Sequence, residues 1–232
     1  MNWVKNWYHN VVVAWQECSK NEAFRRYFTL NFFMCLALYF AIIHWVKINS
    51  ARHGAVLDDP LYHLLMPRDF STAIFILTYS PVFIFLLWIL RYPLLLHRAL
   101  DSFVAVFIIR AVCIHFIPLS PAPGIIVLND PISNAMADES QVLNDLFFSG
   151  HIGDLATLFF LCGNKWLRRY IFASAAIVAL LLVWQRVHYS VDVLTAPFFS
   201  YLCYYAFVQK DIIWSALLKK PELTSPIPGF ST

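Results

Sequence analysis

Two histidines in the C-terminal third of the chain carry its clearest chemical signal. His151 follows Ser149 and Gly150 at the start of one apolar run. His188 begins a second such run, and Asp192 lies four residues after it. On a helix, side chains four residues apart stack on one face, so we expect the carboxylate of Asp192 to orient the imidazole of His188 and to balance its charge. An imidazole held in this way is typical of an activated nucleophile.

The composition predicts a protein embedded in a membrane. Of the 232 residues, 60% are apolar and 13% are charged, and the mean hydropathy is +0.62. A soluble domain has about a quarter of its residues charged. A helix needs about 20 mostly apolar residues to cross the hydrocarbon core. Six segments come near that length: residues 28–46, 71–90, 94–119, 149–163, 170–187 and 188–208. We therefore expect an all-α, polytopic membrane protein with six transmembrane helices.

The chain divides into three parts on this interpretation. Residues 1–27 form an N-terminal interfacial segment, residues 28–210 a six-helix membrane catalytic domain, and residues 211–232 a C-terminal cytoplasmic tail. In the first part, three tryptophans and a valine recur at helical spacing, which is typical of an amphipathic helix lying in the membrane interface. A terminal helix packed on the bundle is the equal alternative.

Basic residues determine the expected orientation. Most Lys and Arg residues fall on the side that holds both termini, whereas residues 120–150 contain none. The positive-inside rule therefore places the termini in the cytoplasm. The chain crosses the membrane twice between His151 and His188, so both imidazoles face the same, extracytoplasmic side. The loops at residues 47–70 and 120–150 lie on that side too, and the second can cover the site.

The order of these motifs resembles that of a known enzyme group. Asp145, residues 149–151 and, after one helical hairpin, residues 188–193 are similar to the sphingomyelin synthase branch of the type 2 phosphatidic acid phosphatase (PAP2) superfamily. Two upstream stretches extend the resemblance, the second more loosely: Arg110 with residues 117–123, and residues 58–69. The resemblance covers roughly residues 57–207 and implies a PAP2-like helical bundle.

Departures from the superfamily pattern bear on the substrate. No Arg-Pro dipeptide occurs, and Leu181 and Leu182 stand where the wider superfamily has a Ser-Arg pair. In the superfamily those basic residues hold a terminal phosphate monoester. Their absence, shared with the sphingomyelin synthase branch, favours a phosphodiester of lower charge. Leu143 and Asn144 replace the usual Cys-Gly of the branch, and Ile152 replaces its usual Thr, which leaves the headgroup open.

The resemblance and the residues together imply a lipid phosphotransferase. His188 attacks phosphorus to form a phosphohistidine while His151 protonates the departing lipid oxygen, and His151 then activates the acceptor. The expected reaction moves a phosphocholine or phosphoethanolamine headgroup from a glycerophospholipid to a lipid alcohol such as ceramide. A lipid phosphatase or phospholipase C-like hydrolase would use the same residues with water as acceptor. A lipid transporter or scramblase is the alternative from another class.

No metal or other cofactor is expected, because the imidazoles and helix ends take the role of a divalent cation. The cysteines are widely spaced and show neither a metal spacing nor a disulfide framework: Cys18, Cys35, Cys113, Cys162 and Cys203. The aromatic side chains near span ends suit belts at headgroup level and not a nucleic-acid surface. The expected partners are the donor and acceptor lipids, and the oligomeric state is left open.

Five further residues are expected to bind substrate: Asp145, Ser149, Gly150, Arg110 and Arg186. Ser149 and Gly150 open a predicted helix whose backbone N–H groups and positive dipole end would face the phosphoryl oxygens. Asp145 has three interpretations, because it could pair with an amine headgroup, orient His151 or be a solvated loop acid.

The two arginines each have two interpretations. Arg110 lies inside a predicted span, where a guanidinium must face a polar cavity or a partner. It would clamp a phosphate bidentately, or form an ion pair with Asp101 or Asp154. Arg186 precedes His188 by two residues and would contact phosphate or anchor the chain at the interface.

Overall fold

The computed structural model describes residues 2–50, 52, 54–129 and 146–209. Over these residues the chain is helical and contains no strand. Seven α-helices are described, together with a 3₁₀ turn at Pro60–His63 and a π-helical turn at Tyr205–Gln209. The α-helices are α1 (Asn2–Lys20), α2 (Glu22–Ser50), α3 (Ser71–Ile89), α4 (Pro93–Phe116), α6 (Gly150–Leu161), α7 (Lys165–Trp184) and α8 (Ser190–Tyr204).

Four of the described helices are long and apolar enough to cross a membrane: α3, α4, α7, and α8 with the turn that continues it to Gln209. The expected span at residues 28–46 falls within α2, which has 29 residues. The expected span at residues 149–163 corresponds to α6, a shorter apolar helix of 12 residues. These elements support an all-helical, integral membrane protein, while the count of six transmembrane helices stays a prediction.

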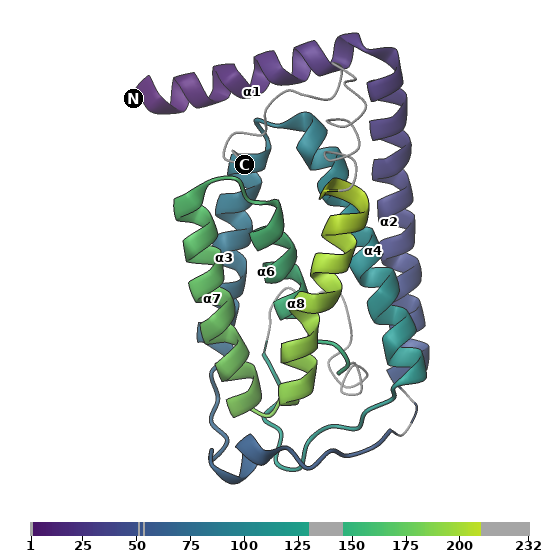
Figure 1. Ribbon diagram of the computed structural model, residues 1–232, viewed down its shortest axis with the longest axis vertical. Coiled ribbons are helices and arrows are strands. Elements are labelled where there is room, and N and C mark those ends of the chain that lie inside the picture. The colour runs from purple at the N-terminus through teal and green to yellow at the C-terminus, as the bar shows by residue number, and fades with distance from the viewer. Residues whose placement is uncertain (1, 51, 53, 130–145, 210–232) are drawn as a thin grey trace.

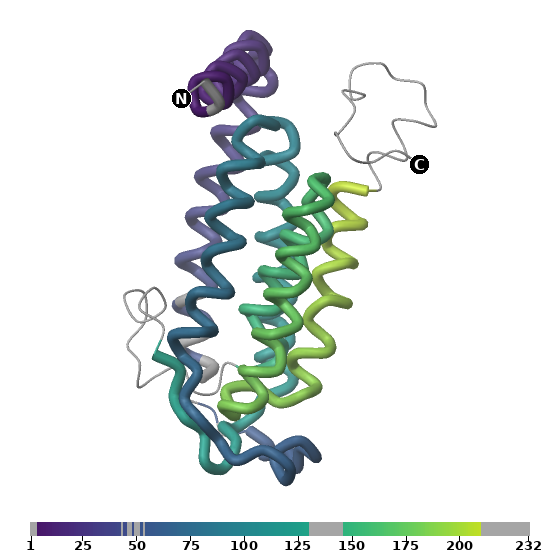
Figure 2. The backbone as a smooth tube through the Cα atoms, turned by 90° about the vertical axis from the view of Figure 1, so that its left-hand side faces the viewer, coloured from purple at the N-terminus to yellow at the C-terminus, as the bar shows by residue number. Residues whose placement is uncertain are grey.

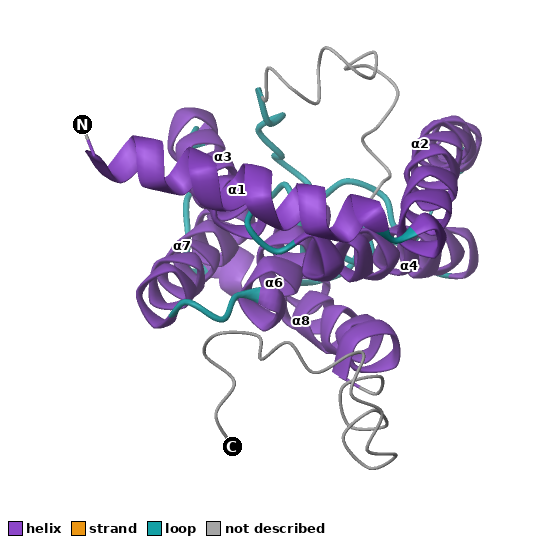
Figure 3. Cartoon of the chain, turned by 90° about the horizontal axis from the view of Figure 1, so that it is seen from above, coloured by secondary structure: helices purple, strands orange, loops and turns teal. Residues whose placement is uncertain are grey.

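The short helix α6 forms the centre of the bundle (Figure 3). It packs against α3, α4, α7 and α8, and apolar residues around its circumference are buried, among them Ile152, Leu155 and Leu158. A helix that is apolar all round is expected in such a surrounded position. The peripheral helix α2 differs, because it packs on α4 and α1 and exposes large side chains such as Phe33 and Phe40, which suits contact with lipid.

Helix α1 lies across one end of the bundle, nearly at right angles to α2 (Figures 1 and 2). The indole Nε1 of Trp7 donates to the Leu87 carbonyl at 3.0 Å, and that of Trp15 donates to the Leu90 carbonyl at 2.8 Å. These contacts at the end of α3 favour the alternative of a helix packed on the bundle. The interfacial location of residues 1–27 stays a prediction, and the expected tail at 211–232 lies outside the described residues.

The opposite end of the bundle carries the turn that bears His188. Helix α8 begins there, near the turn at Pro60–His63, whereas the shorter helix α6 begins further inside the bundle (Figure 1). The expectation that His151 and His188 face the same side of the membrane stays a prediction. Which side of the membrane that end faces stays a prediction.

A buried amide joins the peripheral helix α2 to α4. Asn31 Nδ2 donates to Asp101 Oδ1 at 2.7 Å and lies 3.1 Å from His97 Nδ1. Asn31 is buried, so its amide would be costly in an apolar environment without these partners. The contact fixes the rotational position of α2 against α4.

Replacing this amide should loosen the bundle without disturbing its other end. Asn31→Leu should lower the free energy of unfolding by about 1 kcal/mol, the usual value of an interhelical hydrogen bond in a membrane. For a chain of this size the melting temperature should fall by about 2–4 °C, measured in detergent micelles. Met34→Leu, on the exposed side of α2, is the control and should leave the melting temperature unchanged. Equal melting temperatures for both variants would contradict the prediction.

Candidate active site

The turn between α7 and α8 carries His188 outside any helix. Helix α8 begins at Ser190, so the prediction that His188 and Asp192 stack on one helical face is wrong. The physical reason is a cap: Asp192, in the first turn, accepts a hydrogen bond from the backbone N–H of Tyr189 at 3.0 Å. A carboxylate that bonds back in this way makes Tyr189 the N-cap of the helix, because it satisfies an N–H group that has no helical partner. The helix therefore begins after His188.

The imidazole of His188 nevertheless reaches Asp192. Nδ1 of His188 lies 3.5 Å from Oδ2 of Asp192, and the two residues are only 4% and 0% exposed. Among the described residues, neither His188 Nδ1 nor Asp192 Oδ1 has a hydrogen-bond partner. A separation of 3.5 Å is at the long end of hydrogen bonding, and catalytic hydrogen bonds often shorten only when substrate binds. The carboxylate faces Nδ1, so Nε2 is the nitrogen left for chemistry.

The second histidine segment is tied directly to this pair. The backbone N–H of Ser149 donates to the carbonyl of Asp192 at 3.1 Å, and Ser149 itself is fully buried. His151 lies in the first turn of α6, two residues further on. One backbone hydrogen bond thus joins the start of α6 to the first turn of α8. It brings together two segments that are separated in sequence by a helical hairpin.

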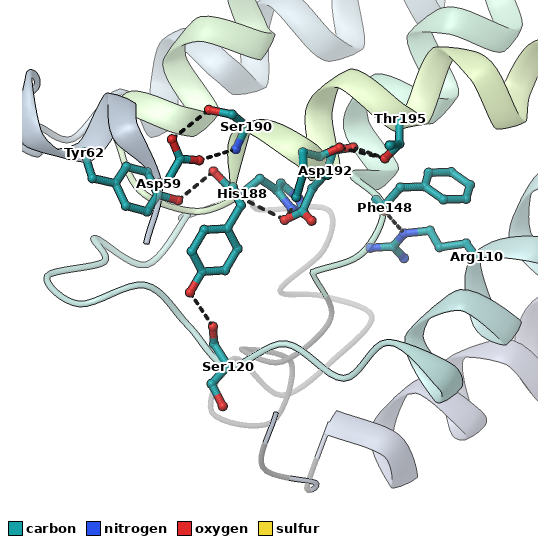
Figure 4. A network of polar contacts seen from close by, with 11 residues as sticks. Asp59, Tyr62, Arg110, Ser120, Phe148, His188, Ser190, Asp192 and Thr195 are labelled. Carbon is teal, nitrogen blue, oxygen red and sulfur yellow. Dashed lines mark hydrogen bonds and ion pairs between the residues drawn. The ribbon is translucent and has the colours of Figure 1, made fainter. Parts of the chain in front are cut away.

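Arg110 approaches the same region from α4. Its Nε donates to the Phe148 carbonyl at 2.8 Å, and Figure 4 shows the guanidinium turned towards the His188–Asp192 pair. A Cβ atom at Gly150 would lie 3.3 Å from Arg110 Cζ. Glycine at this position therefore lets the guanidinium pack closely against the first turn of α6. Arg110, Ser149 and Gly150 accordingly lie together, and their role in binding substrate stays a prediction.

Of the two acids proposed as ion-pair partners of Arg110, one lies away from the arginine and the other lies near it. Asp101 binds the side chain of Asn31, nearer the other end of α4. Asp154 lies one turn after His151 and is close enough to His151 and Arg110 for electrostatic attraction. The remaining predicted site residue, Asp145, lies outside the described residues, so its role stays a prediction.

Arg186 holds two loops together. Its Nη1 donates to the Pro123 carbonyl at 2.6 Å, its Nη2 donates to the Tyr62 carbonyl at 2.9 Å, and the guanidinium stacks over the Tyr62 ring at 5.3 Å. Its backbone has φ of 61°, a left-handed conformation that is uncommon for a residue other than glycine. The structure thus shows Arg186 bridging backbone carbonyls, and a contact with phosphate stays a prediction.

Three further residues stabilise the turn, a role that the sequence did not indicate: Asp59 and Tyr62, in the stretch at residues 58–69, and Gln185. The Tyr62 hydroxyl donates to the His188 carbonyl at 2.9 Å. Burial raises the pKa of Tyr62 above its ordinary value, so the hydroxyl keeps the proton that it donates. Gln185 is fully buried, accepts from the Phe70 N–H at 2.8 Å and donates to the Ile126 carbonyl at 3.2 Å.

Asp59 is the furthest of these residues from the turn in sequence. Its carboxylate accepts from both the backbone N–H and the hydroxyl of Ser190, at 2.5 and 3.0 Å (Figure 4). The Asp-Pro dipeptide at 59–60 is a turn signal that could have indicated the short helix at Pro60–His63. Nothing local in the sequence indicates a partner 131 residues away.

Comparison with known proteins gives one match. Residues 144–210 match the family model described as PAP2 superfamily C-terminal. The match covers less than a third of the chain and includes His151, His188 and Asp192, but neither Arg110 nor Asp59. It supports membership of the PAP2 superfamily and activity of the lipid phosphatase or phosphotransferase type. The sphingomyelin synthase-like branch stays a prediction.

No curated protein and no solved structure gives a significant match. Within the part of the chain that the structure describes, no group of three or more His, Cys, Asp or Glu side chains is arranged to hold a metal ion. All five cysteines lie in that part and are free.

The bridge made by Arg186 should determine how rigid the loop between α2 and α3 is. Arg186→Met keeps much of the side-chain length but removes the donors to Tyr62 and Pro123. Hydrogen bonds from a charged group contribute about 1.5–3 kcal/mol each, so backbone hydrogens of residues 57–64 should exchange at least about tenfold faster. Hydrogen exchange followed by mass spectrometry measures this. Arg91→Met, at the other end of the bundle, should leave exchange in that loop unchanged, and equal exchange in both variants would contradict the bridge.

Proposed function

We propose that the chain is a membrane-embedded lipid phosphotransferase that moves a phosphocholine or phosphoethanolamine headgroup from a glycerophospholipid to a lipid alcohol such as ceramide. The observation that carries the proposal is the buried His188–Asp192 pair, 3.5 Å apart, joined through the Ser149 N–H to the segment that bears His151. The match of residues 144–210 to the PAP2 superfamily supports the same class of reaction.

The first half-reaction uses both imidazoles. Nε2 of neutral His188 attacks phosphorus while Asp192 stabilises the positive charge that develops on the ring. The bond between phosphorus and the diacylglycerol oxygen breaks, and His151 as general acid gives that oxygen its proton. A phosphohistidine and diacylglycerol result. Arg110 and the first turn of α6 would bind the phosphoryl oxygens, because a guanidinium and a helix N-terminus both attract anions.

The second half-reaction reverses these roles. His151, now without its proton, accepts the proton of the ceramide hydroxyl, and the hydroxyl oxygen attacks phosphorus. The bond between phosphorus and Nε2 breaks, which returns His188 to its neutral form. Water in place of ceramide would give hydrolysis with the same residues. Transfer depends on how well the site excludes water.

Two features support the proposed substrate and the side of the membrane that the site faces. Leu181 and Leu182, where the wider superfamily has its Ser-Arg pair, favour a phosphodiester over the more highly charged monoester. The excess of basic residues on the side of the termini favours a site that faces the extracytoplasmic side, with the termini in the cytoplasm.

The reaction can be tested directly with purified protein. Incubation with labelled phosphatidylcholine or phosphatidylethanolamine and ceramide should give a labelled sphingolipid, detected by lipid chromatography. His188→Ala should abolish the product, and Asp192→Asn should lower its rate about a hundredfold or more, because the imidazole loses its orienting charge. Release of the phosphorylated headgroup alone would indicate the hydrolase. No turnover on either phospholipid, with lipid movement retained in His188→Ala, would indicate the transporter or scramblase.

The covalent intermediate gives a separate prediction. With donor labelled at phosphorus and no acceptor, alkaline quenching should preserve a label on His188, because phosphohistidine is stable in base and labile in acid. Mass spectrometry of the digested protein locates the label. His63→Ala is the control, since His63 is exposed and pairs with Asp58. Label retained in His188→Ala would contradict the assignment of the nucleophile.

A further inference from the structure

We infer that Asp59, in the loop between α2 and α3, is a positioning residue for the His188–Asp192 pair: it caps α8 from a distance and so keeps the carboxylate of Asp192 available to the histidine. The inference rests on the proposed function for its catalytic consequence. Its structural part stands on the contacts of Asp59 alone.

The carboxylate of Asp59 is buried at the N-terminus of α8. Asp59 is 5% exposed, its Oδ2 accepts from the Ser190 N–H at 2.5 Å, and its Oδ1 accepts from the Ser190 hydroxyl at 3.0 Å. Oδ1 also accepts from the Leu61 N–H at 3.0 Å, which fixes the carboxylate within its own loop. A negative group at a helix N-terminus is favourable because it satisfies unpaired N–H groups and faces the positive end of the helix dipole.

The residue at the start of α8 leaves this task to Asp59. An N-cap position is usually occupied by Ser, Thr, Asp or Asn, whose short side chain caps its own helix. Here the position is Tyr189, which makes no side-chain cap. Its hydroxyl instead donates to the Ser120 carbonyl at 2.9 Å and accepts from the Leu57 N–H at 3.3 Å. For its first N–H groups, the start of the helix therefore depends on two other carboxylates, those of Asp192 in its own first turn and of Asp59 in the loop between α2 and α3.

Two carboxylates share those N–H groups. Asp192 takes the N–H of Tyr189 with the same Oδ2 that faces His188 Nδ1, and Asp59 takes the N–H of Ser190. Without Asp59, the Ser190 N–H would lose its acceptor. Asp192 would then be the carboxylate that remains at this end of the helix. Rotation of Asp192 towards that N–H would move it away from the imidazole. Asp59 prevents this competition.

The same loop also holds the backbone of the histidine. Tyr62 follows Asp59 by three residues, and its hydroxyl donates to the His188 carbonyl (Figure 4). The loop therefore forms hydrogen bonds with the turn at His188 and at Ser190, on either side of Tyr189. A displacement of this loop would move the imidazole and the start of α8 together.

The neighbouring acid provides a matched control. Asp58 carries the same charge in the same loop, but its side chain is 88% exposed and accepts from His63 Nε2 at 2.7 Å. Asp58→Asn removes one negative charge next to Asp59 without touching α8. Any effect that follows from the net charge of the loop should appear in both variants, and an effect of the cap should appear only in Asp59→Asn.

The test combines a spectroscopic and a kinetic measurement. With ¹⁵N-labelled histidine, the Nδ1 resonance of His188, assigned by its loss in His188→Ala, should shift in Asp59→Asn because Asp192 has turned away. In Asp58→Asn only the His63 resonance should shift. In the phosphotransfer assay, Asp59→Asn should lower kcat about tenfold to a hundredfold and leave KM within about twofold, since a displacement of about 1 Å has effects of this size. Asp59→Glu should recover part of the loss.

The outcomes separate this inference from the proposed function. If the unaltered protein shows no turnover, the proposed function fails, while the resonance of His188 still tests the cap. An unmoved His188 resonance in folded Asp59→Asn overturns the inference, as does a loss of activity that only follows the loss of folded protein. If Asp59→Asn does not fold, Asp59→Glu replaces it, because the longer side chain keeps the charge but displaces the carboxylate from the Ser190 N–H. It should shift the His188 resonance in the same direction by less, and no shift would overturn the inference.

Discussion

The carboxylate of Asp192 is the group on which the arrangement of the site depends. It is fully buried, it accepts the N–H of Tyr189, and it faces Nδ1 of His188, while the backbone carbonyl of the same residue accepts the N–H of Ser149. A buried charge is costly unless hydrogen bonds and opposite charge surround it. The start of α8 and the imidazole provide part of that surrounding, at Oδ2. One residue thus links the cap of a helix, the orientation of the histidine and the contact with α6.

The connections between helices, more than the helices themselves, fix the reactive end of the protein. Gln185, Arg186 and Tyr62 bind backbone groups of loops that are far apart in sequence, and most of these partners are carbonyls or N–H groups without a helical or strand partner. Such groups must be satisfied wherever they are buried, so each bond both stabilises a loop and positions the turn that bears His188. The helix bundle supports the loops, and the hydrogen bonds of the loops determine the position of His188.

Apolar segments were enough to predict helices near residues 71–90, 94–119 and 170–187, where α3, α4 and α7 lie. Residue types indicated where the chemistry should lie, and that assignment stays a prediction. The pairing of His188 with Asp192 followed from their spacing, but its geometry did not, because the cap at Tyr189 ends the helix before the histidine. Asp59 lies in the stretch at residues 58–69 that loosely extends the family resemblance, but its contact with α8 could not be predicted, since its partner Ser190 is remote in the chain. The bridging contacts of Arg186 depend on a left-handed backbone that no local pattern indicates.

The shortness of α6 has a consequence for the electrostatics of the site. Twelve residues extend about 18 Å at 1.5 Å per residue, whereas the 20 residues of α7 extend about 30 Å, the thickness of the hydrocarbon core. Helix α6 is surrounded by its neighbours, and its positive end, at the partly buried Gly150 and His151, lies against Arg110. Mobile ions screen such a partly buried dipole less than an exposed one. The attraction that this helix end exerts on an anion should therefore depend less on the salt concentration of the surrounding water than that of a helix end in open solution.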